Sequence, residues 1–209
     1  MNTGENTIRS PAACRLKGLL LSALLGLGIS LLSGCGYTVV PPPSPKDPVP
    51  VFLLDHGRHA SLVLPAGENM VRYAYGDWEW YVRRHTGPTQ GSRALFGPSP
   101  AGLGRKVLPG PAAVDSVRRE VVVPIEEIFT LEAGAQQVAS LTQHLEELFT
   151  GNGKTLRYAP EFDLEFVRHP VPYTLRHNSN TVVAKWLLQL GFVIKGDGPL
   201  SQWEVKDRP

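Results

Sequence analysis

Residues 51–65 read VFLLDHGRHASLVLP, and their pattern gives the clearest indication of how the chain folds. It holds two short apolar runs, Val51–Asp55 and Ala60–Leu64, on either side of a break that contains Gly57. Apolar runs of this length, bounded by glycine and proline, are typical of β-strands. The stretch therefore predicts two strands joined by a tight break, as part of an antiparallel sheet.

Downstream of these strands, residues 73–81 are rich in aromatic side chains around a Gly-Asp pair. So many large rings are unsuited to a solvated loop, and they favour either the packed core or the wall of a ligand-binding cleft. Both interpretations stay open. A cleft wall would bind sugar rings, acyl chains or a peptide, and its candidate ligand-binding residues are Tyr75, Trp78 and Tyr81.

Two helices are predicted in the C-terminal half. Apolar residues recur at helical spacing through residues 134–150, and Gly151 with Asn152 gives a stop signal. A second helix begins within residues 178–181, whose side chains are those preferred at helix N-caps, and it ends at Gly191.

The remaining segments complete an α+β fold. Residues 118–124 and 156–167 have strand or hairpin patterns, whereas the Gly- and Pro-rich residues 87–111 predict a long ordered loop or lid with one helical turn at residues 94–96. We therefore expect a single α+β domain over residues 51–209, with helices packed on a central antiparallel sheet.

The N-terminal segment has the pattern of a lipoprotein signal peptide over residues 1–34. Basic residues precede an apolar run at residues 19–32, which is too short to span a membrane, and the run ends in Leu-Ser-Gly-Cys. Cys35 is then expected to become the lipidated first residue, with acyl groups such as palmitate holding it on the bilayer. The alternative is an ordinary signal peptide or a short membrane anchor, followed by a chance cysteine.

Prolines dominate the segment between Cys35 and residue 50 and favour extended polyproline II, so residues 35–50 predict a tether. Gly36 is not the aspartate that retains lipoproteins at the inner membrane of enteric bacteria. We therefore expect a lipid-anchored protein of the cell envelope that faces the periplasm, in the outer membrane where the cell has one.

Several function classes are excluded by composition. Without residues 1–34 the chain has as many acidic as basic residues, so it lacks the charge of a nucleic-acid-binding protein. Cys14 leaves with the signal and Cys35 carries lipid, so no cysteine remains for catalysis or a disulfide. His56 and His59 are three apart, which on a strand points them to opposite faces, so we expect no metal site and no cofactor.

Two places could carry chemistry, the break at residues 56–59 and the helix start at residues 178–181. A nucleophile at a helix N-terminus gains from backbone N–H groups and from the positive end of the dipole, which also stabilise an oxyanion. A histidine on a neighbouring strand can act as its base. Together these features would form the geometry of papain-type hydrolases.

At these residues the chain resembles a known group. Four motifs occur in the order of a bacterial family of unknown function that is sometimes encoded near urease genes, and the resemblance covers about residues 50–195. That family is similar to permuted papain-like hydrolases of the cell-wall-peptidase type, so the resemblance implies a permuted papain-like fold. The motifs are residues 55–65, Tyr75-Gly76-Asp77 with Tyr81, residues 94–97, and residues 173–175 with Asn180-Thr181.

The resemblance implies candidate catalytic residues. His59 matches the family histidine in its Gly-x-His pattern, and Asp77 lies in a matched motif without an assigned role. Ser179 stands where the family has cysteine, between the matched Asn178, a candidate ligand-binding residue, and Asn180. Unlike a thiol, a serine hydroxyl needs a base to remove its proton during attack.

Three interpretations of Ser179 follow: an inert N-cap in a relic hydrolase fold, which we favour, a working nucleophile, or an N-cap in an unrelated fold. His59 is either the general base or a strand histidine bonded to a carbonyl. We expect a catalytically degenerate envelope lipoprotein that binds or assists cell-envelope material, with peptidoglycan, lipid or an envelope protein as partner. The alternative is a hydrolase or acyltransferase that uses Ser179 and His59.

Overall fold

The structure is a computed structural model, and it describes residues 36–84, 97–198 and 201–206. These residues form a mixed α/β fold with two sheets. Neighbouring strands of the larger sheet are all antiparallel, and in the smaller sheet only the β1–β10 pair is parallel. The larger sheet has the order β6 (Glu127–Gly134), β2 (Pro48–Asp55), β3 (Ala60–Ala66), β4 (Asn69–Asp77), β5 (Ser99–Leu108), β8 (Leu164–Tyr173), β7 (Arg157–Ala159), and the smaller one β10 (Trp203–Val205), β1 (Tyr37–Val40), β9 (Val193–Lys195).

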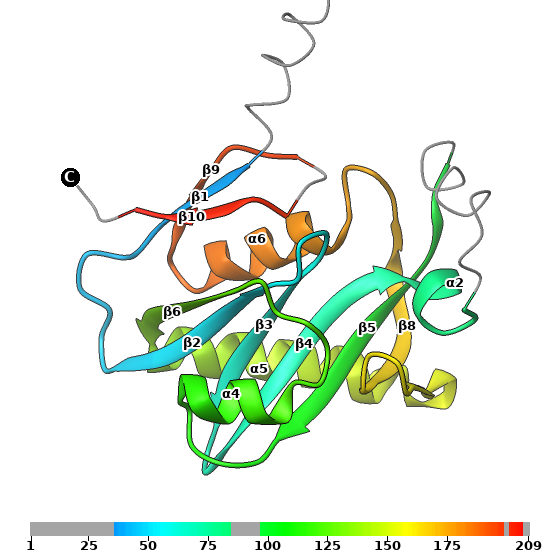
Figure 1. Cartoon of the computed structure of the whole chain (residues 1–209), viewed down its shortest axis with the longest axis horizontal. Helices are drawn as coiled ribbons and strands as arrows, with labels where there is room; N and C mark the ends of the chain where they lie inside the picture. The colour runs from blue at the N-terminus through cyan, green and yellow to red at the C-terminus, as the bar shows by residue number, and fades with distance from the viewer. Residues whose placement is uncertain (1–35, 85–96, 199–200, 207–209) are drawn as a thin grey trace, which may run out of the picture. The chain divides into compact units, whose positions relative to one another are not determined.

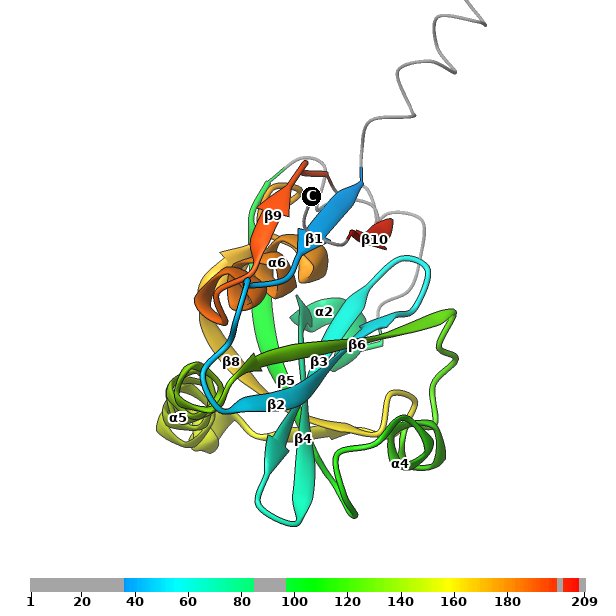
Figure 2. The same cartoon turned by 90° about the vertical axis from the view of Figure 1, so that its left-hand side faces the viewer.

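The helices cover both faces of the larger sheet. The long helix α5 (Ala135–Gly151) and α6 (Ser179–Gln189) pack on one face, while α4 (Val114–Glu120) packs on the other, as Figures 1 and 2 show. This division follows from the pleat, because successive side chains of a strand point to opposite faces. On β2, Leu53 joins the α5–α6 core and Phe52 joins the α4 core.

The smaller sheet lies on the far side of α6, so that this helix is enclosed between the two sheets (Figure 2). Val39 of β1 and Trp203 of β10 share one buried cluster with Leu187 of α6. Two shorter elements complete the described chain: the helix α2 (Trp78–Tyr81), which follows β4 directly, and the 3-10 turn η1 (Gly153–Thr155).

The central predictions from the sequence are confirmed. The two strands around the residue 56–59 break are β2 and β3, and the two predicted helices are α5 and α6. The strand or hairpin predicted for residues 156–167 is the hairpin of β7 and β8, although β8 continues to Tyr173. The fold is mixed and its sheets are mostly antiparallel, as expected.

The tether predicted for residues 35–50 is wrong. Residues 37–40 form β1, the middle strand of the smaller sheet, and residues 48–50 already belong to β2, where they pair with β6. Tyr37 and Val39 are buried. The prolines of this segment occupy the short link between the two strands and the outer end of β2, where a missing N–H is tolerated.

Two further segments differ from the prediction. The strand predicted for residues 118–124 is wrong: residues 118–120 end the helix α4 and residues 121–124 belong to no helix or strand. The helix forms because Val117 and the residues around it bury one helical face while charged residues cover the other. Residues 99–108 form β5 rather than a loop. Its glycines serve close packing, since a Cβ on Gly104 would lie 2.8 Å from the ring of Phe166 on β8. The helical turn predicted at residues 94–96 lies outside the described residues.

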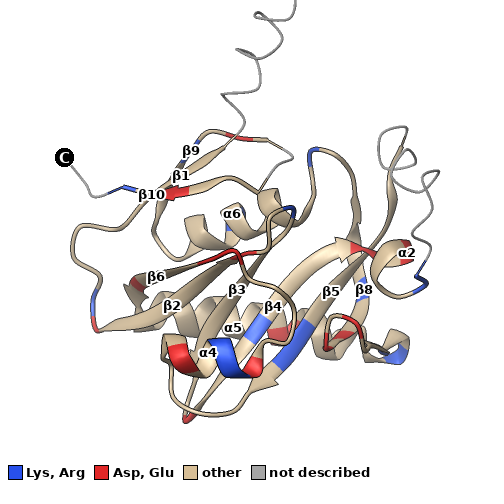
Figure 3. Cartoon of the chain, in the orientation of Figure 1, with Lys and Arg blue, Asp and Glu red and all other residues tan. Residues whose placement is uncertain are grey.

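Acidic and basic residues are mixed along α4 and across the sheet behind it (Figure 3). Within the described part of the chain, no helix combines the length and apolarity needed to cross a bilayer. The predicted signal peptide and Cys35 lie outside the described residues.

Candidate functional site

The turn between β2 and β3 positions the two candidate histidines. Gly57 has φ +84°, and the space beside its Cα is occupied by the Glu126 side chain, so the position requires glycine. The backbone N–H of His56 donates to the carbonyl of His59 at 2.9 Å, and the N–H of Gly57 donates to Asp55 Oδ1 at 2.8 Å. The turn therefore has one defined conformation.

Asp55 also ties this turn to the smaller sheet. Its Oδ1 accepts a hydrogen bond from the hydroxyl of Ser201 at 2.6 Å, and Ser201 Oγ in turn accepts one from Nε1 of Trp203 at 3.1 Å. Asp55 and Ser201 are both buried, so water does not weaken these hydrogen bonds. The C-terminal strand thus supports the loop that carries the histidines.

The N-terminus of α6 meets the same turn. Asn178 is the N-cap: its Oδ1 accepts from the N–H groups of Asn180 at 2.9 Å and Thr181 at 3.0 Å, and the Thr181 hydroxyl completes a capping box. Nδ2 of Asn180 donates to the carbonyl of Arg58 at 3.2 Å, which fastens the helix to the turn.

Ser179 is therefore not the N-cap that the sequence suggested but the first residue of the helix. Its Oγ lies 3.1 Å from Nδ1 of His59. The side chain of Asn178 makes its hydrogen bonds to the backbone of its own segment, including Nδ2 to the carbonyl of Leu175 at 2.8 Å, so its position is explained by capping.

The His59–Ser179 pair has the predicted distance but little access. Ser179 is only 1% exposed, whereas His59 is partly exposed. Burial, with a smaller effect from the Arg58 charge, lowers the pKa of His59 and so makes it a weaker base. Among the described residues, no side chain or carbonyl forms a hydrogen bond with Nε2 of His59; its other neighbour is the ring of Tyr81, 5.8 Å away and edge-on.

Asp77 is not brought to this pair. Its Oδ1 accepts from the N–H of Trp80 at 2.9 Å as the N-cap of α2, and its Oδ2 accepts from the hydroxyl of Ser99. Within the described residues, no hydrogen bond joins Asp77 to His59 or to Ser179.

The aromatic residues of segment 73–81 divide between core and cavity. Tyr75 is buried against Tyr173, with its hydroxyl donating to the carbonyl of Val171 at 3.0 Å, and Trp78 packs under the guanidinium of Arg168 at 4.4 Å. Only Tyr81 of the three candidates lines the pocket beside His59.

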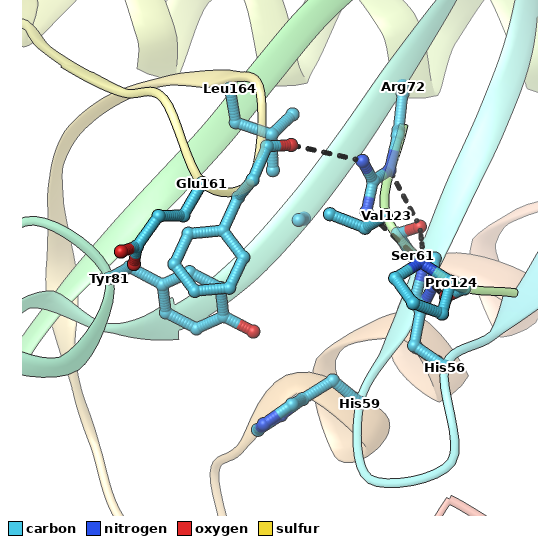
Figure 4. A pocket seen from close by; sticks show the side chains of 12 residues that line it. His56, His59, Ser61, Arg72, Tyr81, Val123, Pro124, Glu161 and Leu164 are labelled. Atoms are coloured by element: carbon cyan, nitrogen blue, oxygen red, sulfur yellow. Dashed lines mark hydrogen bonds between the residues drawn. The ribbon is translucent and has the colours of Figure 1, made fainter. Parts of the chain in front are cut away.

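That pocket has a volume of about 290 Å³ and opens between the β2–β3 turn, β4 and the segment before β8 (Figure 4). Both candidate histidines line it, which corrects the expectation that they point to opposite faces: they sit in a turn, where strand alternation does not apply. The lining residues are His56, His59, Ala60, Ser61, Arg72, Ala74, Tyr81, Val123, Pro124, Glu161, Phe162 and Leu164.

A polar group at one side of this pocket was missed by the sequence reasoning. Arg72 of β4 is only 4% exposed, and its Nε donates to Ser61 Oγ at 3.1 Å. Nη2 of Arg72 lies 3.2 Å from Nε2 of His56, and Ser61 Oγ lies 2.9 Å from the same nitrogen. An arginine inside the otherwise apolar run of residues 70–75 was the available signal.

His56 is neutral in this group. Its Nδ1 lies 2.7 Å from the carbonyl of Pro124, which can only accept, so Nδ1 carries the proton and Nε2 accepts from Ser61 and Arg72. Burial, followed by the Arg72 charge, lowers the pKa of His56 to about 4. The pocket thus holds a cationic guanidinium beside uncharged donors and acceptors.

The part of the chain that the structure describes has no group of three or more His, Cys, Asp and Glu side chains placed to hold a metal ion. Comparisons of the chain with protein-family models, with curated proteins and with solved structures find no match.

Proposed function

We propose that the chain is an envelope lipoprotein, anchored through Cys35, whose papain-like domain binds cell-envelope material without cleaving it. One observation carries the proposal: Ser179 is 1% exposed with its hydroxyl bonded to His59, while the pocket is lined by His59 and not by Ser179. Ser179 then links α6 to the turn, and the pocket is the functional surface.

Catalysis by Ser179 would need a reachable hydroxyl, a competent base and an oriented imidazole. The hydroxyl is covered, and burial weakens His59 as a base. No described group holds Nε2 of His59. In serine proteases, replacing the carboxylate that orients the histidine lowers kcat by about 10⁴, so this arrangement favours binding over turnover.

A second candidate is a serine hydrolase or acyltransferase that uses Ser179 with His59. The distance of 3.1 Å between Ser179 Oγ and His59 Nδ1, at the N-terminus of an eleven-residue helix, favours it. Backbone N–H groups of the first turn would be the donors for an oxyanion. This activity requires the groups that cover Ser179 to move aside for substrate.

The test is intact-mass analysis of a chain of residues 36–209 after exposure to a broad serine-directed fluorophosphonate. We expect no adduct, because a buried and weakly activated hydroxyl does not react. An adduct on the native chain that disappears in Ser179→Ala would overturn the proposal in favour of the hydrolase.

Two single-cysteine variants provide a matched control for the access of reagents to position 179. Iodoacetamide should alkylate Ser179→Cys much more slowly than Ser44→Cys, since Ser44 is exposed on the link between β1 and β2. Equal rates that fall when His59→Ala is added would show an open and activated position 179, against the binding proposal.

A further inference from the structure

Arg72 is a buried cation to which no carboxylate of the described residues is bonded, although the charge of Asp163 acts on it at longer range. Its contacts are to the Ser61 hydroxyl, to Nε2 of His56 and, at 3.5 Å, to the carbonyl of Phe162. All three are uncharged. Across the described residues, no aspartate or glutamate lies within ion-pair distance of its guanidinium. Taking an unpaired charge out of water is strongly unfavourable, so such groups are normally paired or face a ligand.

The carboxylates of Asp163 and Glu161, which lie near Arg72, form hydrogen bonds or ion pairs with other residues. Asp163 bonds to Lys106 and to the hydroxyl of Tyr158. Glu161 lines the same pocket, but it pairs with Arg84, and Figure 4 shows its side chain extending away from Arg72. Asp163 therefore compensates the charge of Arg72 only at longer range, and the guanidinium can still bond directly to an anion that enters the pocket.

The guanidinium also keeps donor capacity. It has five N–H groups, and its three contacts use one on each nitrogen, which leaves one N–H on Nη1 and one on Nη2. Two remaining donors on a planar fork match the two oxygens of a carboxylate. His56 stays neutral beside it, and burial leaves the pKa of Arg72 at about 10, so the cation persists at neutral pH.

The rest of the pocket is small and mostly apolar, and the side chains of His59 and Glu161 also line it. Its apolar walls beyond the polar group come from Ala74, Tyr81, Val123, Phe162 and Leu164. A volume of about 290 Å³ is at the lower end of the range for small-molecule sites. These walls suit a short aliphatic body rather than a sugar or a nucleotide.

We propose that this pocket binds a small aliphatic carboxylate, with the carboxylate on Arg72 and the apolar body against Tyr81 and Leu164. The inference rests on the proposed binding function and names its ligand class. The carboxylate has two possible sources, the C-terminal residue of a peptide or a free alkyl acid, and both present the same group to Arg72.

Isothermal titration of the 36–209 chain tests the proposal with two pairs of probes. N-acetyl-alanine and isovalerate represent the two sources, and N-acetylalaninamide and isovaleramide are their uncharged counterparts. We expect saturable binding of at least one carboxylate and at least tenfold weaker binding of its amide. Equal binding of acid and amide, or no binding of either acid, would overturn the proposal.

Variants locate the binding. Arg72→Met removes the charge at similar volume and should abolish carboxylate binding, while Arg72→Lys keeps the charge without the fork and should weaken it. Arg105→Met is the matched control, because Arg105 lies on the neighbouring strand, pairs with Glu146 and does not line the pocket. Unchanged binding in a folded Arg72→Met would contradict the assignment.

A second variant keeps the test independent of the buried charge. Ala74→Val adds volume inside the pocket and leaves Arg72 in place, so it should lower carboxylate affinity. The two proposals fail separately. Carboxylate binding together with a fluorophosphonate adduct on Ser179 overturns only the non-catalytic function, whereas an inert Ser179 without carboxylate binding overturns only the ligand class.

Discussion

His56 is the neutral neighbour that lets a cation stay buried in the pocket. Its ring donates to Pro124 on one side and accepts from Ser61 and Arg72 on the other. A second proton would have to sit on Nε2, facing the guanidinium at close range. Burial and this charge together lower the pKa of His56 to about 4.

We expect acid to destabilise the fold through His56. Its pKa is lower in the folded than in the unfolded chain, so as the pH falls the unfolded chain binds a proton first. The stabilisation is complete above about pH 6.5 and is lost between there and about pH 4, and it amounts to about 3 kcal/mol. Urea unfolding on either side of this window measures the loss.

His56→Gln should reduce this pH dependence, because glutamine does not titrate. Some dependence should remain, since burial also lowers the pKa values of His59, His169 and His177. The control is His144→Gln at an exposed position of α5, which should leave the contribution of His56 in place. A steep, unchanged profile in His56→Gln would show that another group is responsible.

Residue-level reasoning from the sequence found one end of the pocket and missed the other. His59 and Ser179 were predicted as a pair because each has a local signal, a Gly-x-His break and a helix start. The signal for Arg72 is weaker, a single charged residue in the apolar run of residues 70–75, and it names no partner. Its partners Ser61 and His56 come from other positions that only the β3–β4 and β2–β3 pairings bring near.

Among the secondary-structure elements, α6 has local sequence signals, whereas β1 depends on contacts with distant residues. α6 has a capping box and a periodic apolar face, all within its own residues. β1 has four residues before a run of prolines, and it pairs with β9 and β10, more than 150 positions along the chain. Its strand conformation depends on those partners, so no local pattern predicts it.

Aspartate substitutions in β1 distinguish a buried strand from a free tether. Val39→Asp should destabilise the domain by several kcal/mol, because Val39 is 0% exposed and the carboxylate would enter the core without a partner. Thr38→Asp on the same strand should cost much less, since Thr38 is only partly buried. Urea unfolding compares the two, and equal small effects would support a free tether.

At the scale of the whole molecule, the smaller sheet acts on the pocket from a distance. β10 begins two residues after Ser201, which bonds to Asp55 under the histidine turn, and β1 holds β10 in place. The pocket therefore depends on both ends of the described chain, although its lining residues come only from the middle.

The proposed lipid anchor at Cys35 is tested in the full-length chain, which includes the predicted signal peptide. Expressed in a bacterium that processes lipoproteins, the chain should carry acyl groups and sediment with membranes, and Cys35→Ser should remove both properties. Cys14→Ser is the matched control, because Cys14 leaves with the signal peptide under the same proposal. Acylation that persists in Cys35→Ser would contradict the assignment of the anchor.

The early start of β1 changes what a lipid on Cys35 would mean. Only Gly36 separates that cysteine from Tyr37, the first residue of a buried strand. One extended residue spans about 3.5 Å, so almost no linker would separate the lipid anchor from the folded domain. It would work at the lipid surface itself, and any partner deeper in the periplasm would have to be delivered to it.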